Sequence, residues 1–120
     1  MANEQELQQT AQEFERNRIQ LLNTSAQKQQ LQLQNSAISA ALSELKETKE
    51  KKVYKAVGNI LVLSDVKKVE KETQDQKETL DLRLKTVKKQ EEATLDKLNK
   101  LKAEIESMQK AGQKAAPDSK

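Results

Sequence analysis

Apolar residues along this chain form two long periodic stretches separated by one short apolar block. The block spans Val53 to Ser64, reads VYKAVGNILVLS, and holds a Gly-Asn pair between two runs rich in β-branched residues. About 50 residues lie on each side of it, with no proline before Pro117 and, apart from Gly58 in the block, no glycine before Gly112. Glycine and proline interrupt helices most strongly, so their absence favours two long helices. The pattern therefore predicts a β-hairpin between two helices.

The first helix is predicted over about residues 3–48. Two sets of apolar residues along it have coiled-coil spacing, namely Leu7, Phe14 and Leu21, then Leu31, Ile38, Leu42 and Leu45. The step from Leu21 to Leu31 is ten residues, which is not a multiple of seven. A change of phase of this kind alters the supercoil locally, so the sequence predicts a shift of the apolar stripe near residues 23–30.

The second helix is predicted over about residues 65–110, with Ser64-Asp65 as its N-terminal cap. Its apolar seam has heptad spacing and comprises Val66, Thr73, Leu80, Leu84, Val87, Thr94, Leu98, Leu101, Ile105 and Met108. Lys77 and Glu91 are polar interruptions of the same seam. A repeat sustained over about four heptads indicates that this helix packs against a partner helix along its length.

The chain after Gln109 reads KAGQKAAPDSK and indicates where the second helix ends. Gly112 is expected to stop the helix, because glycine favours the conformation that follows a helix C-terminus, and Pro117 excludes its continuation. We therefore predict a single domain over residues 1–112, followed by a disordered tail over residues 113–120.

A two-residue turn at Gly58-Asn59 reverses the chain, so the two helices are expected to fold back on each other. The predicted fold is mainly α, a long antiparallel two-helix coiled coil joined by a β-hairpin. Pairing about the turn places residue i near residue 117 − i, with both termini at the end away from the hairpin. Each helix of about 45 residues would be roughly 65–70 Å long at 1.5 Å per residue.

The predicted hairpin has two apolar faces. One face pairs Val57 with Ile60, Lys55 with Val62 and Val53 with Ser64, and the other, wholly apolar, pairs Ala56 with Leu61 and Tyr54 with Leu63. A lone two-stranded hairpin is marginal in water, and its open edges invite strands from other subunits. Packing only on its own helices is less favoured, because they offer narrow apolar stripes. We therefore predict an intersubunit β-barrel built through Val53, Tyr54, Val57, Gly58, Ile60, Leu61, Val62 and Leu63.

Composition narrows the possible functions. Hydrophobic residues make up 34% and aromatic residues 2% of 120 residues, too few for a conventional globular core. The chain has no histidine, cysteine or glycine-rich phosphate loop, so we expect neither catalysis nor a metal or cofactor. Its lysines alternate with glutamates, as on a solvated helix face, which disfavours nucleic-acid binding. The polar N-terminus and short apolar runs predict a soluble cytoplasmic protein outside the membrane.

Three segments carry a resemblance to a known family. VYKAVGNILV at residues 53–62 is similar to the hairpin motif of archaeal β-type prefoldin subunits, an aromatic residue and lysine, then glycine, then an apolar strand. ETLDLRLKTVKKQEEATLDKL at residues 78–98 and the glutamine-rich AQKQQLQLQ at residues 26–34 resemble the second and first helices of that family. KETKEKK at residues 46–52 departs from relatives that often carry a turn-like acidic segment there. The resemblance covers about residues 5–110.

The resemblance implies an assembly and a function. Prefoldins are hexamers of two α-type and four β-type subunits, in which the hairpins build a β-barrel platform and the coiled coils extend from it as tentacles. The tips of the tentacles hold unfolded proteins without ATP and pass them to a group II chaperonin. A structural coiled-coil adaptor with a fixed protein partner is the alternative, and the sequence does not separate it from a chaperone.

The resemblance also places client binding at the ends of the two helices. The candidate client-binding residues are Leu7, Phe14, Ile19, Leu22, Leu101, Ile105 and Met108. Each could instead be an ordinary residue of the coiled-coil seam. The seam interpretation is favoured for Leu101 and Ile105. For Leu7 and Met108, which lie near fraying helix ends, client binding and the seam interpretation are equally supported.

Overall fold

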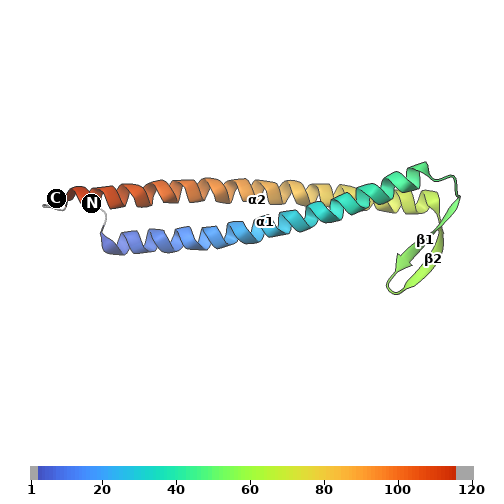
Figure 1. Ribbon diagram of the computed structural model, residues 1–120, viewed down its shortest axis with the longest axis horizontal. Coiled ribbons are helices and arrows are strands. Elements are labelled where there is room, and N and C mark those ends of the chain that lie inside the picture. Colours follow the sequence, from blue (N-terminus) through green and yellow to red (C-terminus); the bar gives the residue numbers. More distant parts are fainter. Residues whose placement is uncertain (1–2, 116–120) are drawn as a thin grey trace. The chain divides into compact units, whose positions relative to one another are not determined.

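The computed structural model describes residues 3–115, and this part of the chain contains two helices and two strands (Figure 1). In chain order these are α1 (Glu4–Glu47), β1 (Lys52–Val57), β2 (Ile60–Asp65) and α2 (Val66–Ala115). The strands pair antiparallel in one sheet. The predicted fold of two long helices joined by a β-hairpin is therefore confirmed, and its closure into a barrel with other subunits stays a prediction.

Helix α1 begins where the sequence predicts. Asn3 directly precedes it, and the side-chain Oδ1 of Asn3 accepts a hydrogen bond from the backbone N–H of Glu6 at 2.7 Å. An asparagine at this position satisfies one of the first N–H groups that have no partner within the helix. The helix ends at Glu47, close to the predicted end at about residue 48.

The covered side of α1 is a continuous heptad seam, and the predicted shift near residues 23–30 is wrong. Buried and half-buried side chains recur in steps of three and four residues at Leu7, Thr10, Phe14, Asn17, Leu21, Thr24, Lys28, Leu31, Asn35, Ile38, Leu42 and Leu45. Leu21 and Leu31 occupy alternate positions of one repeat, with Thr24 and Lys28 between them. The ten-residue step from Leu21 to Leu31 equals one heptad plus three residues, so it keeps the phase of the repeat. The seam positions between these leucines carry polar residues, so the apolar pattern alone does not reveal the repeat.

The seam predicted for α2 is confirmed. Its buried members are Val66, Thr73, Leu80, Val87, Thr94, Leu98 and Leu101, and its half-buried members are Lys77, Leu84, Glu91, Ile105 and Met108. Thr73 Oγ1 donates to the backbone oxygen of Val69 at 2.7 Å, so its hydroxyl is buried with a partner. At the start of the helix, Val66 N–H donates to the Lys51 backbone oxygen at 2.9 Å. Asp65, predicted as part of the cap, lies with its carboxylate 3.5 Å from Lys52 Nζ.

Helix α2 continues through Gly112 to Ala115, so the prediction that Gly112 stops the helix is wrong. Glycine within a helix costs only about 1 kcal/mol relative to alanine, and the residues around Gly112 are mostly strong helix formers. The disordered tail predicted over residues 113–120 therefore overlaps the helix at its start. Residues 116–120 of that tail lie outside the described residues.

The chain divides into two compact units. The terminal unit comprises the chain up to Gln27 and the chain from Val87 onward, and the hairpin unit comprises Lys28–Thr86. Each unit contains a segment of α1 and a segment of α2, and the second unit also contains both strands. The candidate residues near the helix ends and those of the hairpin therefore belong to different units.

Hydrogen bonds between the helices agree with antiparallel pairing in each unit. In the terminal unit, Ser25 Oγ donates to Glu91 Oε2 at 2.7 Å. In the hairpin unit, Asn35 Nδ2 donates to Asp81 Oδ1 at 2.6 Å, and Lys77 Nζ donates to Asn35 Oδ1 at 3.3 Å. The pairs Ser25–Glu91 and Asn35–Asp81 lie one residue from the predicted pairing of residue i with residue 117 − i. A polar side chain at or beside a coiled-coil seam is satisfied only where a suitable partner lies opposite. These hydrogen bonds therefore favour this register of the two helices over neighbouring registers.

The strand register is confirmed at every predicted pair. The opposed residues are Val53 and Ser64, Tyr54 and Leu63, Lys55 and Val62, Ala56 and Leu61, and Val57 and Ile60. Gly58 opens the turn with a φ of 61°, and it is the glycine of the predicted Gly58-Asn59 pair. Glycine adopts this left-handed conformation without the steric cost that a Cβ would add. The turn chemistry therefore holds the register that sets the two faces of the hairpin.

Candidate functional site

Both faces of the hairpin carry exposed apolar side chains, and one of them also contacts α2 through a lysine. Lys55 lies on the less apolar face, is half-buried, and donates from Nζ to Glu72 Oε2 on α2. On the opposite face, Tyr54, Leu61 and Leu63 are 70%, 68% and 54% exposed. The wholly apolar face is thus the more exposed one. We call it the open face, and it consists of Tyr54, Ala56, Leu61 and Leu63.

The remaining predicted assembly residues extend this exposed apolar area around the hairpin. Val57, Ile60 and Val62 are exposed, as is Gly58 at the turn, and Val53 is half-buried. Both strands have one edge without a partner strand, because the described sheet contains only β1 and β2. A contiguous apolar surface beside free strand edges is typical of a protein interaction site. The structure therefore brings the predicted assembly residues together on one element.

An ion pair between Lys55 and Glu72 joins the hairpin to α2. The hydrogen bond from Lys55 is the main cause that lowers the pKa of Glu72, against the opposing effect of desolvation, and the charges of Lys55 and Lys68 add to the lowering. Both side chains remain partly exposed, so the pair contributes modestly to stability. It is a contact between β1 and α2 that depends on the ionised form of Glu72.

Acidification should release the hairpin from α2. Because the pKa of Glu72 is lowered from 4.5 in the folded chain, the pair stabilises the docked hairpin above about pH 4.5 and is lost as the pH falls through the lowered value. Tyr54 is the only tyrosine of a chain without tryptophan, so its fluorescence reports on the hairpin. We expect a fluorescence transition below pH 4.5 that Glu72→Gln removes.

Asp81 provides a matched control for this titration. Hydrogen bonds, first from Asn35 and then from Lys77, lower its pKa as well, but Asp81 contacts no hairpin residue in these bonds. The Asp81→Asn variant should therefore keep the fluorescence transition of the unchanged chain. An identical transition in the Glu72→Gln variant would show that Glu72 does not hold the hairpin.

The seven predicted client-binding residues differ in exposure. Leu101 is 5% exposed and belongs to the buried seam. The half-buried seam residues among them are Leu7, Phe14, Ile105 and Met108. Ile19 and Leu22 lie outside the seam and are 47% and 58% exposed. All seven belong to the terminal unit, so the structure places them in one unit but separates seam residues from exposed ones.

Leu95 is an exposed apolar residue of the terminal unit that the sequence analysis did not single out. It follows the buried seam residue Thr94 and is 47% exposed. In the sequence, Leu95 can be recognised only as an apolar residue at a heptad position that does not have to be apolar. Leu33 and Leu82 are exposed leucines of the same kind in the hairpin unit, at 69% and 67%.

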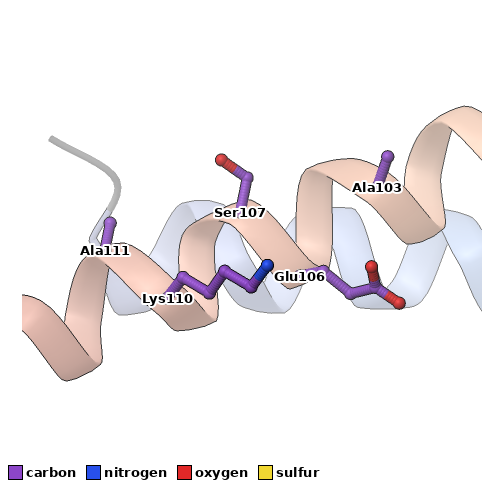
Figure 2. Close-up of a pocket in the computed structure, with 5 residues that line it drawn as sticks. All are labelled: Ala103, Glu106, Ser107, Lys110 and Ala111. Carbon is purple, nitrogen blue, oxygen red and sulfur yellow. The ribbon is translucent and has the colours of Figure 1, made fainter.

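One surface hollow in the described part of the chain lies along a single helix. Figure 2 shows this hollow, which is lined by Ala103, Glu106, Ser107, Lys110 and Ala111, all from successive turns of α2. A groove along one helix lacks the convergent polar groups from several elements that a ligand site requires. Among the described residues, no group of three or more acidic, histidine or cysteine side chains is placed to hold a metal ion. Neither α1 nor α2 includes a described segment apolar enough to cross a membrane.

Comparison with known proteins relates most of the chain to one family. A family model for the prefoldin subunit matches residues 8–112. The prefoldin subunit beta of Pyrobaculum calidifontis is 33% identical over 114 residues, which cover 92% of this chain and 91% of that protein. The prefoldin subunit beta of Saccharolobus islandicus is 43% identical over 56 residues, 47% of this chain and 44% of that protein. The latter match thus spans less than half the length of the relative.

A solved structure has the same fold. The crystal structure of the prefoldin beta subunit from Thermococcus strain KS-1 superposes with a TM-score of 0.80 at 32% sequence identity. The match covers 85% of this chain and 90% of that chain. The similarity therefore extends over both helices and the hairpin rather than over a single motif.

Proposed function

The chain belongs to the prefoldin family, and from this premise we propose that it is a cytoplasmic, ATP-independent chaperone subunit that captures unfolded proteins. The resemblance to β-type subunits is confirmed by the relatives and the solved structure. Prefoldins are a chaperone family, not an enzyme family. The observation that carries the proposal is the open face of the hairpin, an apolar surface too exposed for a subunit that works alone.

Assembly with α-type prefoldin subunits would cover the open face. The two strands leave two free edges, and Tyr54, Leu61 and Leu63 project from one side of them. Closing such edges with strands from neighbouring subunits removes unpaired backbone groups and buries the apolar side chains together. A hexamer of two α-type and four β-type subunits, as the family resemblance implies, is the assembly that we propose.

Client capture is assigned to the apolar residues of the terminal unit. Ile19 and Leu22 are exposed outside the seam, and the half-buried candidates are Leu7, Phe14, Ile105 and Met108. Helix ends open locally at low free-energy cost, so half-buried side chains there can exchange a seam contact for a client contact. Flexible side chains such as methionine suit contacts with varied apolar partners. Leu101 is left in the seam because it is buried.

Transfer of the captured protein to a group II chaperonin completes the proposed function and rests on the family resemblance. The alternative function is a structural adaptor that binds one fixed protein partner. The two differ in an observable way, because a chaperone protects several unrelated unfolded proteins from aggregation without ATP and an adaptor does not.

Removing residues 1–11 and 105–120 should leave assembly intact and eliminate most of the protection of unfolded proteins. The truncation deletes Leu7, Ile105 and Met108 but leaves the hairpin unit unchanged. We would measure light scattering by two unrelated proteins diluted from denaturant without ATP, and the size of the assembly by sedimentation velocity.

A variant that lacks only residues 116–120 is the control, because it retains every apolar candidate residue. It should protect both proteins as the full chain does. If the longer truncation also protects them fully, the helix ends are not the capture site. If the full-length assembly protects neither protein, the chaperone function is wrong and the adaptor is favoured.

A further inference from the structure

Asn35, Lys77 and Asp81 form a closed hydrogen-bonded cluster between α1 and α2 in the hairpin unit. Asn35 and Lys77 are half-buried at seam positions of the two helices, and Asp81 follows the buried seam residue Leu80. Asn35 Nδ2 donates to Asp81 Oδ1 at 2.6 Å, and Lys77 Nζ donates to Asn35 Oδ1 and to Asp81 Oδ2, each at 3.3 Å. Each of the three side chains therefore bonds to the other two.

We propose that this cluster is a register lock, which holds α1 and α2 in one alignment and rejects alignments displaced by one heptad. Polar side chains at seam positions of coiled coils fix the alignment of the helices and lower their stability relative to apolar side chains. The cluster determines the specificity of helix pairing. The inference concerns the pairing of α1 with α2 and does not depend on the chaperone function.

A displacement of one heptad deprives Lys77 of its partner on α1. The residues seven positions before and after Asn35 are Lys28 and Leu42, so one of them would take the place of Asn35 beside Lys77. Lys28 would bring a second positive charge into the seam, and Leu42 would offer the ammonium group no acceptor. Both neighbouring alignments are therefore penalised, which is the property that a register lock requires.

The terminal unit contains a second hydrogen bond that discriminates in the same way. Ser25 Oγ donates to Glu91 Oε2 at 2.7 Å, and Glu91 is a half-buried seam residue. The residues seven positions before and after Glu91 are Leu84 and Leu98, neither of which can accept a hydrogen bond from a side chain. The same displacement would therefore also break the bond between Ser25 and Glu91.

Other features of α1 discriminate poorly between alignments. Charged residues beside the seam usually set the pairing of coiled coils, but between Arg18 and Glu44 the only charged residue is Lys28, which lies in the seam. The apolar seam positions repeat every seven residues, so a displacement of one heptad places seam residues opposite seam residues again. The junction KETKEKK at residues 46–52 consists mostly of helix formers without glycine or proline, so it does not require α1 to end at Glu47.

The double variant Asn35→Leu/Lys77→Leu tests the register lock in the full chain. The chain has no cysteine, so spin labels can be attached at Gln34→Cys and Gln76→Cys, which line one groove between the helices. Pulsed electron spin resonance, on labelled chains diluted with unlabelled ones, should give one distance for the parent. The double variant should add a second distance, because a slip of one heptad moves the labels by about 10 Å along the helices. Its midpoint of urea unfolding should rise, because the seam becomes more apolar.

Two further variants separate the lock from a general effect of polar side chains. The control Gln74→Leu/Glu78→Leu removes a 3.4 Å hydrogen bond within α2 and should keep the single distance. Asn35→Leu alone removes the bonds of the cluster between the helices but keeps the ion pair of Lys77 with Asp81. It should also show the second distance, and it provides the test if the double variant aggregates.

The conservative variant Lys77→Arg should keep the single distance, because arginine can donate to both partners of Lys77. A single distance in the variants that lack Asn35 overturns the inference. A second distance in the Gln74→Leu/Glu78→Leu control also overturns it, because any added apolar side chain would then loosen the alignment. A single distance together with a lower urea midpoint would show that the cluster only stabilises the helices.

Discussion

Replacing both Leu61 and Leu63 with aspartate should convert the assembled protein into smaller species while the helix content stays nearly unchanged. Both leucines lie on the open face of the hairpin and are 68% and 54% exposed in the single chain. Burial of a leucine against a partner contributes about 1.5–3 kcal/mol, and a carboxylate at the same place would lose its hydration. A loss of roughly 3 kcal/mol or more per contact weakens association by at least about a hundredfold.

Sedimentation velocity, on the chain alone and mixed with an α-type prefoldin subunit, measures this effect directly. Circular dichroism checks that the helices remain. The control is Leu33→Asp/Leu82→Asp, because these leucines are also highly exposed, at 69% and 67%, but lie on the helices rather than on the hairpin. The control should assemble as the parent does. An unchanged size for the hairpin variant would refute the assembly role of the open face.

A second large effect is expected from Leu80→Ala, which should lower the free energy of unfolding by about 2–3 kcal/mol. Leu80 is 7% exposed in the seam of α2, so truncation removes buried apolar contacts and leaves a cavity. The cost should lie at the lower end of the range for buried leucines, because the walls of a two-helix seam can move together. Urea denaturation followed by circular dichroism, at one fixed protein concentration, would measure the difference.

Leu82→Ala is the control for this substitution. Leu82 is two residues further along the same helix and is 67% exposed. Since alanine is the better helix former, its substitution should be neutral within about 0.5 kcal/mol or slightly stabilising. If both substitutions lower the free energy of unfolding by the same amount, burial in the seam does not determine how much a leucine contributes to stability.

The two helices differ in how well their seams could be predicted. In α2 most seam positions carry apolar residues or threonine, so the hydrophobic pattern revealed the repeat directly. In α1 the seam includes Asn17, Thr24, Lys28 and Asn35, which interrupt the apolar pattern and give it the appearance of a shift. Polar residues of this kind are identified only by their cross-helix partners, such as Asp81 for Asn35.

The candidate client surface was only partly predictable for a related reason. Apolar residues near the helix ends could be chosen from the sequence, but their exposure could not. Leu101 and Leu22 are both leucines of the terminal unit, yet one is 5% and the other 58% exposed. Leu95 does not stand out in the sequence because it follows the seam residue Thr94, and an apolar residue beside a seam position adds nothing to the heptad pattern.

Spacing along the chain was enough to establish the element order, the hairpin register and the family. These depend on residues close in sequence: a glycine at a turn, alternation along a strand, a repeat of seven along a helix. Which face of the hairpin is more exposed was decided by the tertiary structure, in which Lys55 contacts Glu72 on another element while Tyr54 and Leu61 on the opposite face stay exposed. The same holds for which leucines are exposed, because burial depends on what packs against a side chain and not on the side chain itself.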